Sequence, residues 1–287
     1  MNKVEQALVD SMEQVLLYLK MNDSNSEFTL GTDNLINWFK KLDSRLEKKY
    51  EEIGRENFLN IGNRNVEIYG EDFFSNKDEL KKILIGIKDS HFSPGIKLKL
   101  GYFVENFSTV LDWKIEQLIS HVIVVINDTE CPIDKEKLDR LFCDMIPYYS
   151  GFNIIGSYDA LMHYGLFSMK SVCSAHLELS VVDEEIERLY PNCEKPCVNR
   201  ISTIVYSDGY VYPCEGLVGL KNAAIDKINA SSDEMKIFEE RRKPLLEWYK
   251  DGPKLENEDI IVESDELPYY CRKHRAQLIE QSKGNCF

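Results

Sequence analysis

Residues 122–126 read Val-Ile-Val-Val-Ile, and this short run decides the fold class. All five side chains are apolar and β-branched, which favours a strand that is buried on both faces. Other short strands are predicted along the chain, with helical patterns between them. The predicted strands are 65–69, 96–104, 122–126 and 152–155, and the predicted helices are 78–88, 113–119 and 134–145. Strands that alternate with helices favour parallel pairing, so we expect an α/β barrel or partial barrel.

The segment before this alternation is expected to be helical. Residues 1–20 place apolar side chains at helical spacing, at Val4, Leu8, Met12, Val15, Leu16 and Leu19. A second helix is predicted from Thr32, which with Asp33 suits a helix start, to about Leu46. The first 60 residues are therefore predicted to form an N-terminal helical region.

The C-terminal third has a different pattern. Residues 200–206 and 210–212 flank Ser207-Asp208-Gly209, which predicts a strand–turn–strand hairpin with glycine where a positive φ is needed. Helices are predicted over 178–191, 232–250 and 267–281.

Composition narrows the class of protein. The 287 residues carry 35 Lys and Arg against 49 Asp and Glu, a net charge of −14. Nucleic acid is not expected as a partner, because phosphate binding depends on Lys and Arg. No apolar run approaches the roughly 20 residues that cross a bilayer, and the first residues are polar where a signal peptide is apolar. We therefore expect a cytoplasmic protein without a membrane partner.

The eight cysteines are concentrated towards the C-terminus. None precedes Cys131, and Cys193-x3-Cys197-x16-Cys214 is followed by Cys271 and Cys286. Four thiolates can hold one [4Fe–4S] cluster, and two cysteines on a tight loop, one at a hairpin end and one on a returning helix could converge on it. We expect Cys193, Cys197, Cys214 and Cys271 as ligands, with Cys286 as the substitute for Cys271. A zinc site with the same four sulfurs and four unrelated buried thiols are the alternatives.

Part of this pattern resembles a known family. Cys197-x11-Gly209-x4-Cys214, with its Ser-Asp-Gly turn and Val-Tyr-Pro-Cys, is similar to the opening motif of SPASM or twitch domains. These domains bind auxiliary clusters in radical S-adenosylmethionine enzymes that modify peptides and proteins or build cofactors. The resemblance implies a partial (β/α) barrel over 61–190, followed by a cluster-binding domain over 191–287.

The second barrel strand of that superfamily normally ends in Gly-Gly-Glu-Pro and helps to hold the amino group of S-adenosylmethionine. Here the corresponding residues are Tyr69-Gly70-Glu71-Asp72, so only Gly70 and Glu71 match. The resemblance implies that these two residues line a remnant of the cofactor pocket. The strand at 121–126, with Asn127-Asp128 after it, resembles a later barrel strand that commonly ends in Asp-Gly.

One motif of the family is missing. A radical S-adenosylmethionine enzyme needs Cys-x3-Cys-x2-Cys near its first strand, and this chain has no cysteine before Cys131. S-adenosylmethionine is therefore a doubtful cofactor. The resemblance implies a degenerate enzyme, or a partner-dependent maturase, that binds one auxiliary cluster in a peptide or protein modification system. Its expected partners are a peptide or protein substrate and a modification enzyme, and the alternative is a zinc-stabilised interaction module without a redox role.

Overall fold

The structure of the chain is a computed structural model. It describes residues 12–22, 27–54, 64–126, 134–145, 152–167, 177–181, 203–213, 218–219 and 221–251. Within these residues no helix is both long enough and apolar enough to cross a membrane.

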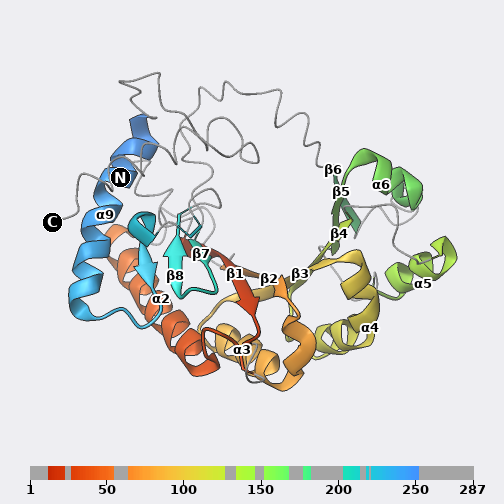
Figure 1. Cartoon of the computed structure of the whole chain (residues 1–287), viewed down its shortest axis with the longest axis horizontal. Coiled ribbons are helices and arrows are strands. Elements are labelled where there is room, and N and C mark those ends of the chain that lie inside the picture. Colours follow the sequence, from red (N-terminus) through yellow and green to blue (C-terminus); the bar gives the residue numbers. More distant parts are fainter. Residues whose placement is uncertain are drawn as a thin grey trace.

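The described residues form a mixed α/β fold around one nine-stranded sheet (Figure 1). Its strands are β1 (Gln14–Lys20), β2 (Asn65–Glu71), β3 (Ser93–Lys99), β4 (His121–Ile126), β5 (Phe152–Gly156), β6 (Leu177–Val181), β7 (Thr203–Val205), β8 (Tyr210–Tyr212) and β9 (Asp226–Lys227). The α-helices are α2 (Thr32–Ile53), α3 (Lys77–Asp89), α4 (Leu100–Ile115), α5 (Lys135–Met145), α6 (Tyr158–His163) and α9 (Ser232–Asp251), and short 3-10 helices cover Phe73–Asn76 and Lys221–Ala223.

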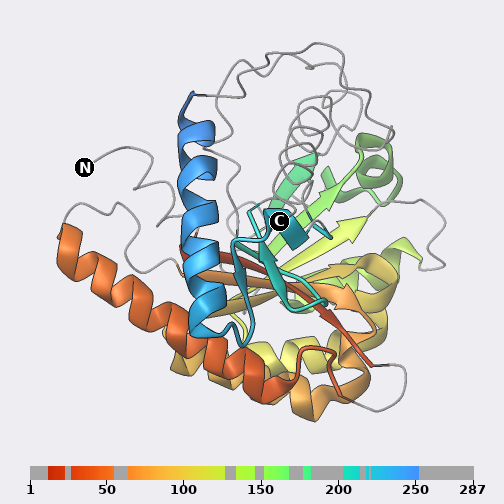
Figure 2. The same ribbon diagram turned by 60° about the vertical axis from the view of Figure 1, so that its left-hand side comes forward.

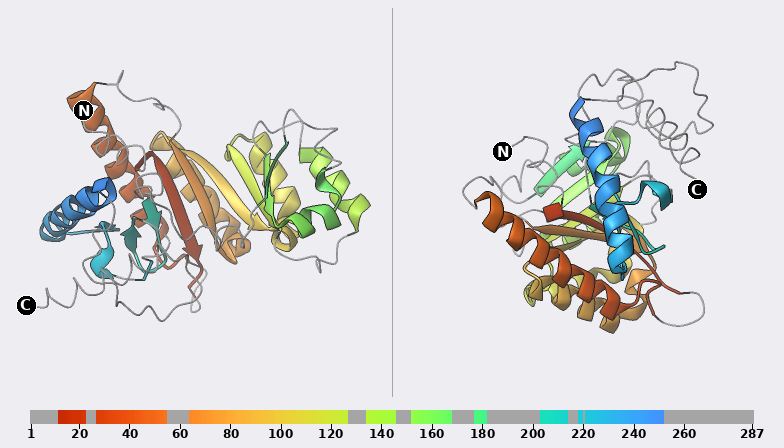
Figure 3. Two further views of the ribbon diagram at one scale, coloured as in Figure 1. Left: turned by 90° about the horizontal axis from the view of Figure 1, so that it is seen from above. Right: turned by 90° about the vertical axis from the view of Figure 1, so that its left-hand side faces the viewer.

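The strand order across the sheet is β6-β5-β4-β3-β2-β1-β7-β8-β9. Strands β1 to β6 are parallel and follow one another in chain order. Because crossovers between parallel strands are right-handed, winding in one direction places the connecting helices on one face. Figure 1 shows α2, α3, α4 and α5 along the outer side of a curved sheet, and Figure 3 shows the strands fanned by their twist. The other face of the sheet lies on the inner side of the curve.

The hydrophobic core lies between the sheet and these helices. Alternate side chains of β1 are buried on this side, at Val15, Leu17 and Leu19. Helix α2 buries a matching stripe that includes Phe39 and Leu46. Period-two burial on strands and helical burial on α2 are what a sheet covered by helices on one face requires.

The β7–β8 hairpin extends the same sheet. Strand β7 pairs in parallel with β1, and β8 pairs antiparallel with both β7 and β9. Figure 2 shows α9 beside this part of the sheet. The turn residue Gly209 has φ +83°, which explains glycine in the Ser-Asp-Gly sequence. One sheet therefore includes residues from all three predicted regions, and the division at 60 and 190 stays an expectation.

Most of the predicted elements are confirmed. The strands at 65–69, 122–126 and 152–155, the helices at 78–88, 134–145 and 232–250, the helix that begins at Thr32 and the hairpin are all present. The mainly parallel α/β class is confirmed with them. The predicted helix at 267–281 lies outside the described residues.

The predicted helix over 1–20 is wrong where the structure describes it, because Gln14–Lys20 is strand β1. The side chains of Val15, Leu17 and Leu19 face the helices, while Leu16 packs on the other face against a cluster that includes Ile204 and Tyr212. Burial on both faces gives a strand consecutive apolar residues, which imitate helical spacing.

Three further predicted elements have other bounds in the structure. The predicted strand 96–104 ends at Lys99, and helix α4 covers Leu100–Ile115 rather than 113–119. Helix α4 buries Leu100, Phe103 and Val110 at helical spacing, so packing continues the helix back to the end of β3. The predicted helix 178–191 is also wrong at its start, because residues up to Val181 form β6 beside β5.

Candidate functional site

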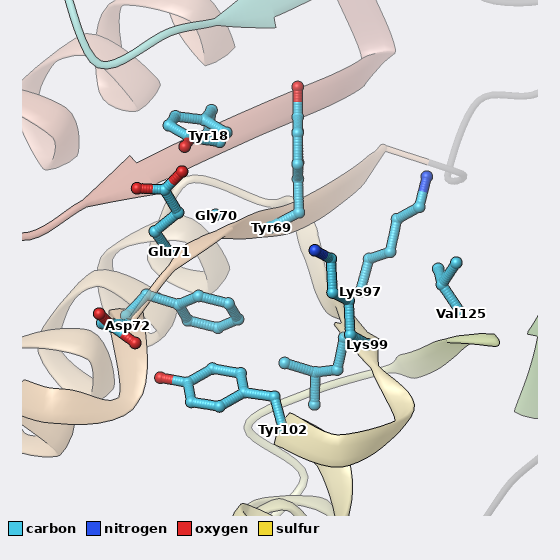
Figure 4. Close-up of a pocket in the computed structure, with 11 residues that line it drawn as sticks. Tyr18, Tyr69, Gly70, Glu71, Asp72, Lys97, Lys99, Tyr102 and Val125 are labelled. Carbon is cyan, nitrogen blue, oxygen red and sulfur yellow. The ribbon is translucent and has the colours of Figure 1, made fainter. Parts of the chain in front are cut away.

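A pocket opens where strands β2 and β3 separate at their carboxyl ends. Their parallel pairing stops at Ile68 and Ile96. Strand β1 nevertheless follows β2 to Glu71, and β4 follows β3 to Lys99. The resulting cavity of about 540 Å³ is lined by Tyr18, Tyr69, Gly70, Glu71, Asp72, Phe73, Lys97, Leu98, Lys99, Tyr102 and Val125 (Figure 4). The carboxyl ends of parallel strands are where open α/β sheets and barrels bind ligands.

Gly70 has no side chain, and this allows the backbone of β2 to lie close to that of β1. Gly70 has φ +148°, and a Cβ atom there would lie 1.8 Å from the carbonyl oxygen of Leu19. Asp72 then adopts a left-handed conformation, with φ 51°, and the chain turns into the short helix at Phe73. These two residues turn the chain away from β3 and so shape one wall of the pocket.

Aromatic rings line the pocket on two sides. The ring of Tyr18 meets that of Tyr69 edge-on at 5.3 Å between centroids, and it stacks on Tyr206 at 4.6 Å. On the other side, the hydroxyl of Tyr102 accepts a hydrogen bond of 2.9 Å from the backbone N–H of Phe74. Stacked rings and a fixed hydroxyl make these walls well defined before any ligand enters.

The two strands contribute opposite charges. Glu71 and Asp72 lie at the end of β2, whereas Lys97 and Lys99 lie on β3 (Figure 4). Lys97 Nζ is 3.1 Å from Oε1 of Glu67, one step deeper on the same face of the sheet. No ion pair involves Lys99 within the part of the chain that the structure describes. The pocket can therefore present carboxylate oxygens to one end of a ligand and ammonium groups to the other.

Two tyrosine hydroxyls of the pocket resist ionisation. Burial, the charges of Glu71 and Tyr206 and a hydrogen bond donated to Glu71 together raise the pKa of Tyr18 to about 12. Burial also raises the pKa of Tyr102. Both hydroxyls stay protonated at neutral pH, so they can donate hydrogen bonds but cannot act as bases.

The structure places only part of the predicted site. Gly70 and Glu71 line the pocket, and their predicted role in holding a cofactor stays a prediction. The predicted cluster ligands Cys193, Cys197, Cys214 and Cys271, and the substitute Cys286, lie outside the described residues. Among the residues that the structure does describe, no group of three or more His, Cys, Asp or Glu side chains could hold a metal ion.

Several residues that line the pocket are not predicted from the sequence, and the most polar of them are Tyr18, Lys97, Lys99 and Tyr102. Tyr18 lies in a predicted helix and Tyr102 in a predicted strand, so the sequence pattern places neither of them at the carboxyl edge of the sheet. The one available signal was the alternation Lys97-Leu98-Lys99, which puts two cations on one face at the end of a predicted strand.

Comparison with known proteins identifies no family for this chain. No protein-family model matches the sequence, and no curated protein matches it either.

Proposed function

We propose that this chain is an iron–sulfur protein of a peptide or protein modification system. In this proposal the described sheet is a degenerate barrel of the radical S-adenosylmethionine type, and the pocket at its carboxyl edge binds the substrate. Cys193, Cys197, Cys214 and Cys271 hold one auxiliary [4Fe–4S] cluster, and the chain does not itself cleave S-adenosylmethionine. A modification enzyme would then act together with this chain.

The contact between Tyr18 and Tyr206 is the observation that carries the proposal. Tyr206 belongs to the hairpin with the SPASM-like motif, and its ring stacks on Tyr18 in the wall of the pocket. The backbone N–H of Tyr206 also bonds to the carbonyl of Tyr210 across the hairpin, at 3.1 Å. A hairpin that precedes Cys214 by two residues is thus joined to the edge where a barrel ligand would bind.

The chain order of the strands supports the barrel part of the proposal. Six parallel strands run in chain order with α2, α3, α4 and α5 along one face of the sheet, and the pocket opens at the carboxyl edge of these strands. The pocket is within the usual range of about 300–1,000 Å³ for ligand sites. Its opposed charges suit a peptide segment with both amino and carboxylate groups, or a backbone flanked by charged side chains.

Metal analysis after anaerobic purification tests the cluster. We expect about four iron and four sulfide per chain with broad absorption at about 400 nm, as for a [4Fe–4S] centre. Replacement of Cys214 by Ala should remove iron and absorption together. Replacement of Cys143, an exposed cysteine of α5, should remove neither.

Zinc is the specific alternative. One zinc per chain, lost in the Cys214→Ala variant, would replace the cluster by a zinc-stabilised interaction module. Full iron content and an unchanged spectrum in the Cys214→Ala variant would overturn the ligand assignment. Release of 5′-deoxyadenosine from S-adenosylmethionine under reducing conditions would overturn the proposal that this chain does not cleave S-adenosylmethionine.

A further inference from the structure

A second cavity lies away from the first, between helix α2 and the segment that joins β9 to α9. Its volume is about 340 Å³, and it is lined by four cationic side chains, Lys40, Lys41, Arg45 and Lys227. Among its described lining residues Asp226 alone is acidic. This concentration of positive charge contrasts with the net charge of −14 on the chain.

Two acidic residues of helix α2 are held by a cation from outside the helix. Its acidic residues Asp43 and Glu47 both bind the guanidinium of Arg64, which is buried beneath them. Its basic residues between positions 40 and 49 are Lys40, Lys41, Arg45, Lys48 and Lys49. The two carboxylates of α2 that are nearest in sequence to Lys40 and Lys41 are thus held by Arg64.

Two of the four cations at the cavity already have partners. Arg45 Nη2 is 2.7 Å from Oδ2 of Asp226, and Lys227 Nζ is 2.8 Å from Oε1 of Glu234. These ion pairs join α2, β9 and α9 and so fix the walls of the cavity. Lys40 and Lys41 form no ion pair with any described residue, and both are exposed at its rim.

The other residues that line this cavity are apolar or uncharged polar residues. Trp38 and Met235 provide apolar surface, and the amide of Asn229 provides hydrogen-bonding groups. Trp38 is only 4% exposed, so the surrounding residues hold its side chain in place at the base of the cavity. The cavity therefore combines two unneutralised ammonium groups with an apolar region and a small number of polar groups, as small-molecule sites do.

We propose that this cavity binds a small phosphate-bearing molecule. The phosphate oxygens lie against the ammonium groups of Lys40 and Lys41, and the organic part lies towards Trp38 and Met235. Phosphate fits because it carries close to two negative charges and several acceptor oxygens, which two adjacent ammonium groups can share. This site is independent of the pocket at the carboxyl edge of the sheet and of the function proposed for it.

Isothermal titration of the full chain with ATP and with pyrophosphate, at about 0.15 M salt to screen diffuse attraction, tests the site. The double variant Lys40→Gln/Lys41→Gln should bind at least one of these ligands more than about tenfold more weakly, a loss of about 1.4 kcal/mol. The control is Lys81→Gln/Lys82→Gln, which removes the same charge from two adjacent exposed lysines of α3. The affinity of this control variant for both ligands should stay within about twofold of that of the wild type. Thermal unfolding should show that both double variants fold.

The two probes distinguish the source of the phosphate. Equal affinity for ATP and pyrophosphate would assign recognition to the phosphate group alone, and a clear preference for ATP would add the apolar region; either result supports the site. The absence of binding at millimolar ligand, or equal losses in both double variants, would overturn it. Tighter binding of hexaglutamate than of ATP through Lys40 and Lys41 would also overturn it, in favour of an acidic peptide.

Discussion

The carbonyl oxygen of Leu19 lies where a side chain on Gly70 would have to begin, 1.8 Å from an ideal Cβ position. Gly70 also has φ +148°, a conformation that other residues rarely adopt. The contact is between two backbones, so no side-chain rotation can relieve it. We expect Gly70→Ala to lower the free energy of unfolding by about 3 kcal/mol or more, as measured by urea denaturation.

Gly101 in α4 is the matched control for this substitution. A Cβ atom there meets nothing within 4 Å, and its position is helical. Gly101→Ala should therefore stabilise the protein, by about 0.5–1 kcal/mol. Equal effects of the two substitutions would contradict the backbone contact between β1 and β2.

The ion pair between Arg64 and Asp43 joins α2 to the residue before β2. Both side chains are largely buried, at 6% and 16% exposure, and Glu47 Oε1 accepts a second hydrogen bond of 2.7 Å from Arg64. Arg64→Ala would leave the largely buried carboxylate of Asp43 without its guanidinium partner, with the exposed ring of His91 still 3.1 Å from Oδ2. We expect a loss of about 3–5 kcal/mol in denaturant unfolding.

An exposed ion pair provides the comparison. Arg140 and Glu136 on α5 are 78% and 87% exposed. Arg140→Ala should change the stability by less than about 0.5 kcal/mol. A loss for Arg64→Ala that is no larger than this would show that the buried pair contributes little.

His121 makes the fold sensitive to acid. Its ring covers Gly95, and burial, with a smaller contribution from Lys114, lowers its pKa, while Glu67 opposes this shift. An imidazole with a lowered folded pKa contributes stability above its unfolded value of about 6.5, and this contribution is lost as the pH falls through the folded pKa. Unfolding monitored from pH 7 to 5 should show this decline, and His121→Gln should reduce it. His163→Gln, on the exposed surface of α6, should leave it unchanged.

The carboxylate of Glu71 acts directly on the hydroxyl of Tyr18. Its charge and its hydrogen bond both hold the proton on Tyr18, in addition to the effect of burial. Glu71→Gln should therefore lower the pKa of Tyr18 from its value of about 12, although burial keeps it above that of a free tyrosine. Titration of ¹³Cζ-labelled tyrosine by NMR measures this shift. Glu239→Gln, on α9, should leave the resonance of Tyr18 unchanged, and an unchanged pKa in Glu71→Gln would refute the contact.

The sequence predicts those elements whose local pattern agrees with their packing. Strand β4 is recognisable because every residue from Val122 to Ile126 is apolar and β-branched, and helix α2 because its buried residues repeat at helical spacing. The sequence of strand β1 imitates a helix because Leu16 packs on the face opposite Val15 and Leu17. In such a strand the apolar pattern reports burial and not conformation.

Only some of the residues that line the pocket can be predicted from the sequence. A resemblance predicts Gly70 and Glu71 as residues of a ligand site, and both line the pocket. The cationic wall depends on how far β2 and β3 separate after Ile68, and no local pattern of residues encodes that separation. Tyr18 reaches the pocket only because β1 lies next to β2, which is a property of the topology.

The parallel pairing of β1 with β7 has a consequence for synthesis on the ribosome. Leu17 is paired with Val205, which leaves the ribosome 188 residues later. At about 5–20 residues per second this delay is roughly 10–40 s, during which one edge of an apolar strand has no partner. An unpaired strand edge is a template for pairing with other chains. A nascent chain therefore exposes this edge of β1 to association during the interval, and a chaperone that shields it would raise the yield of folded protein.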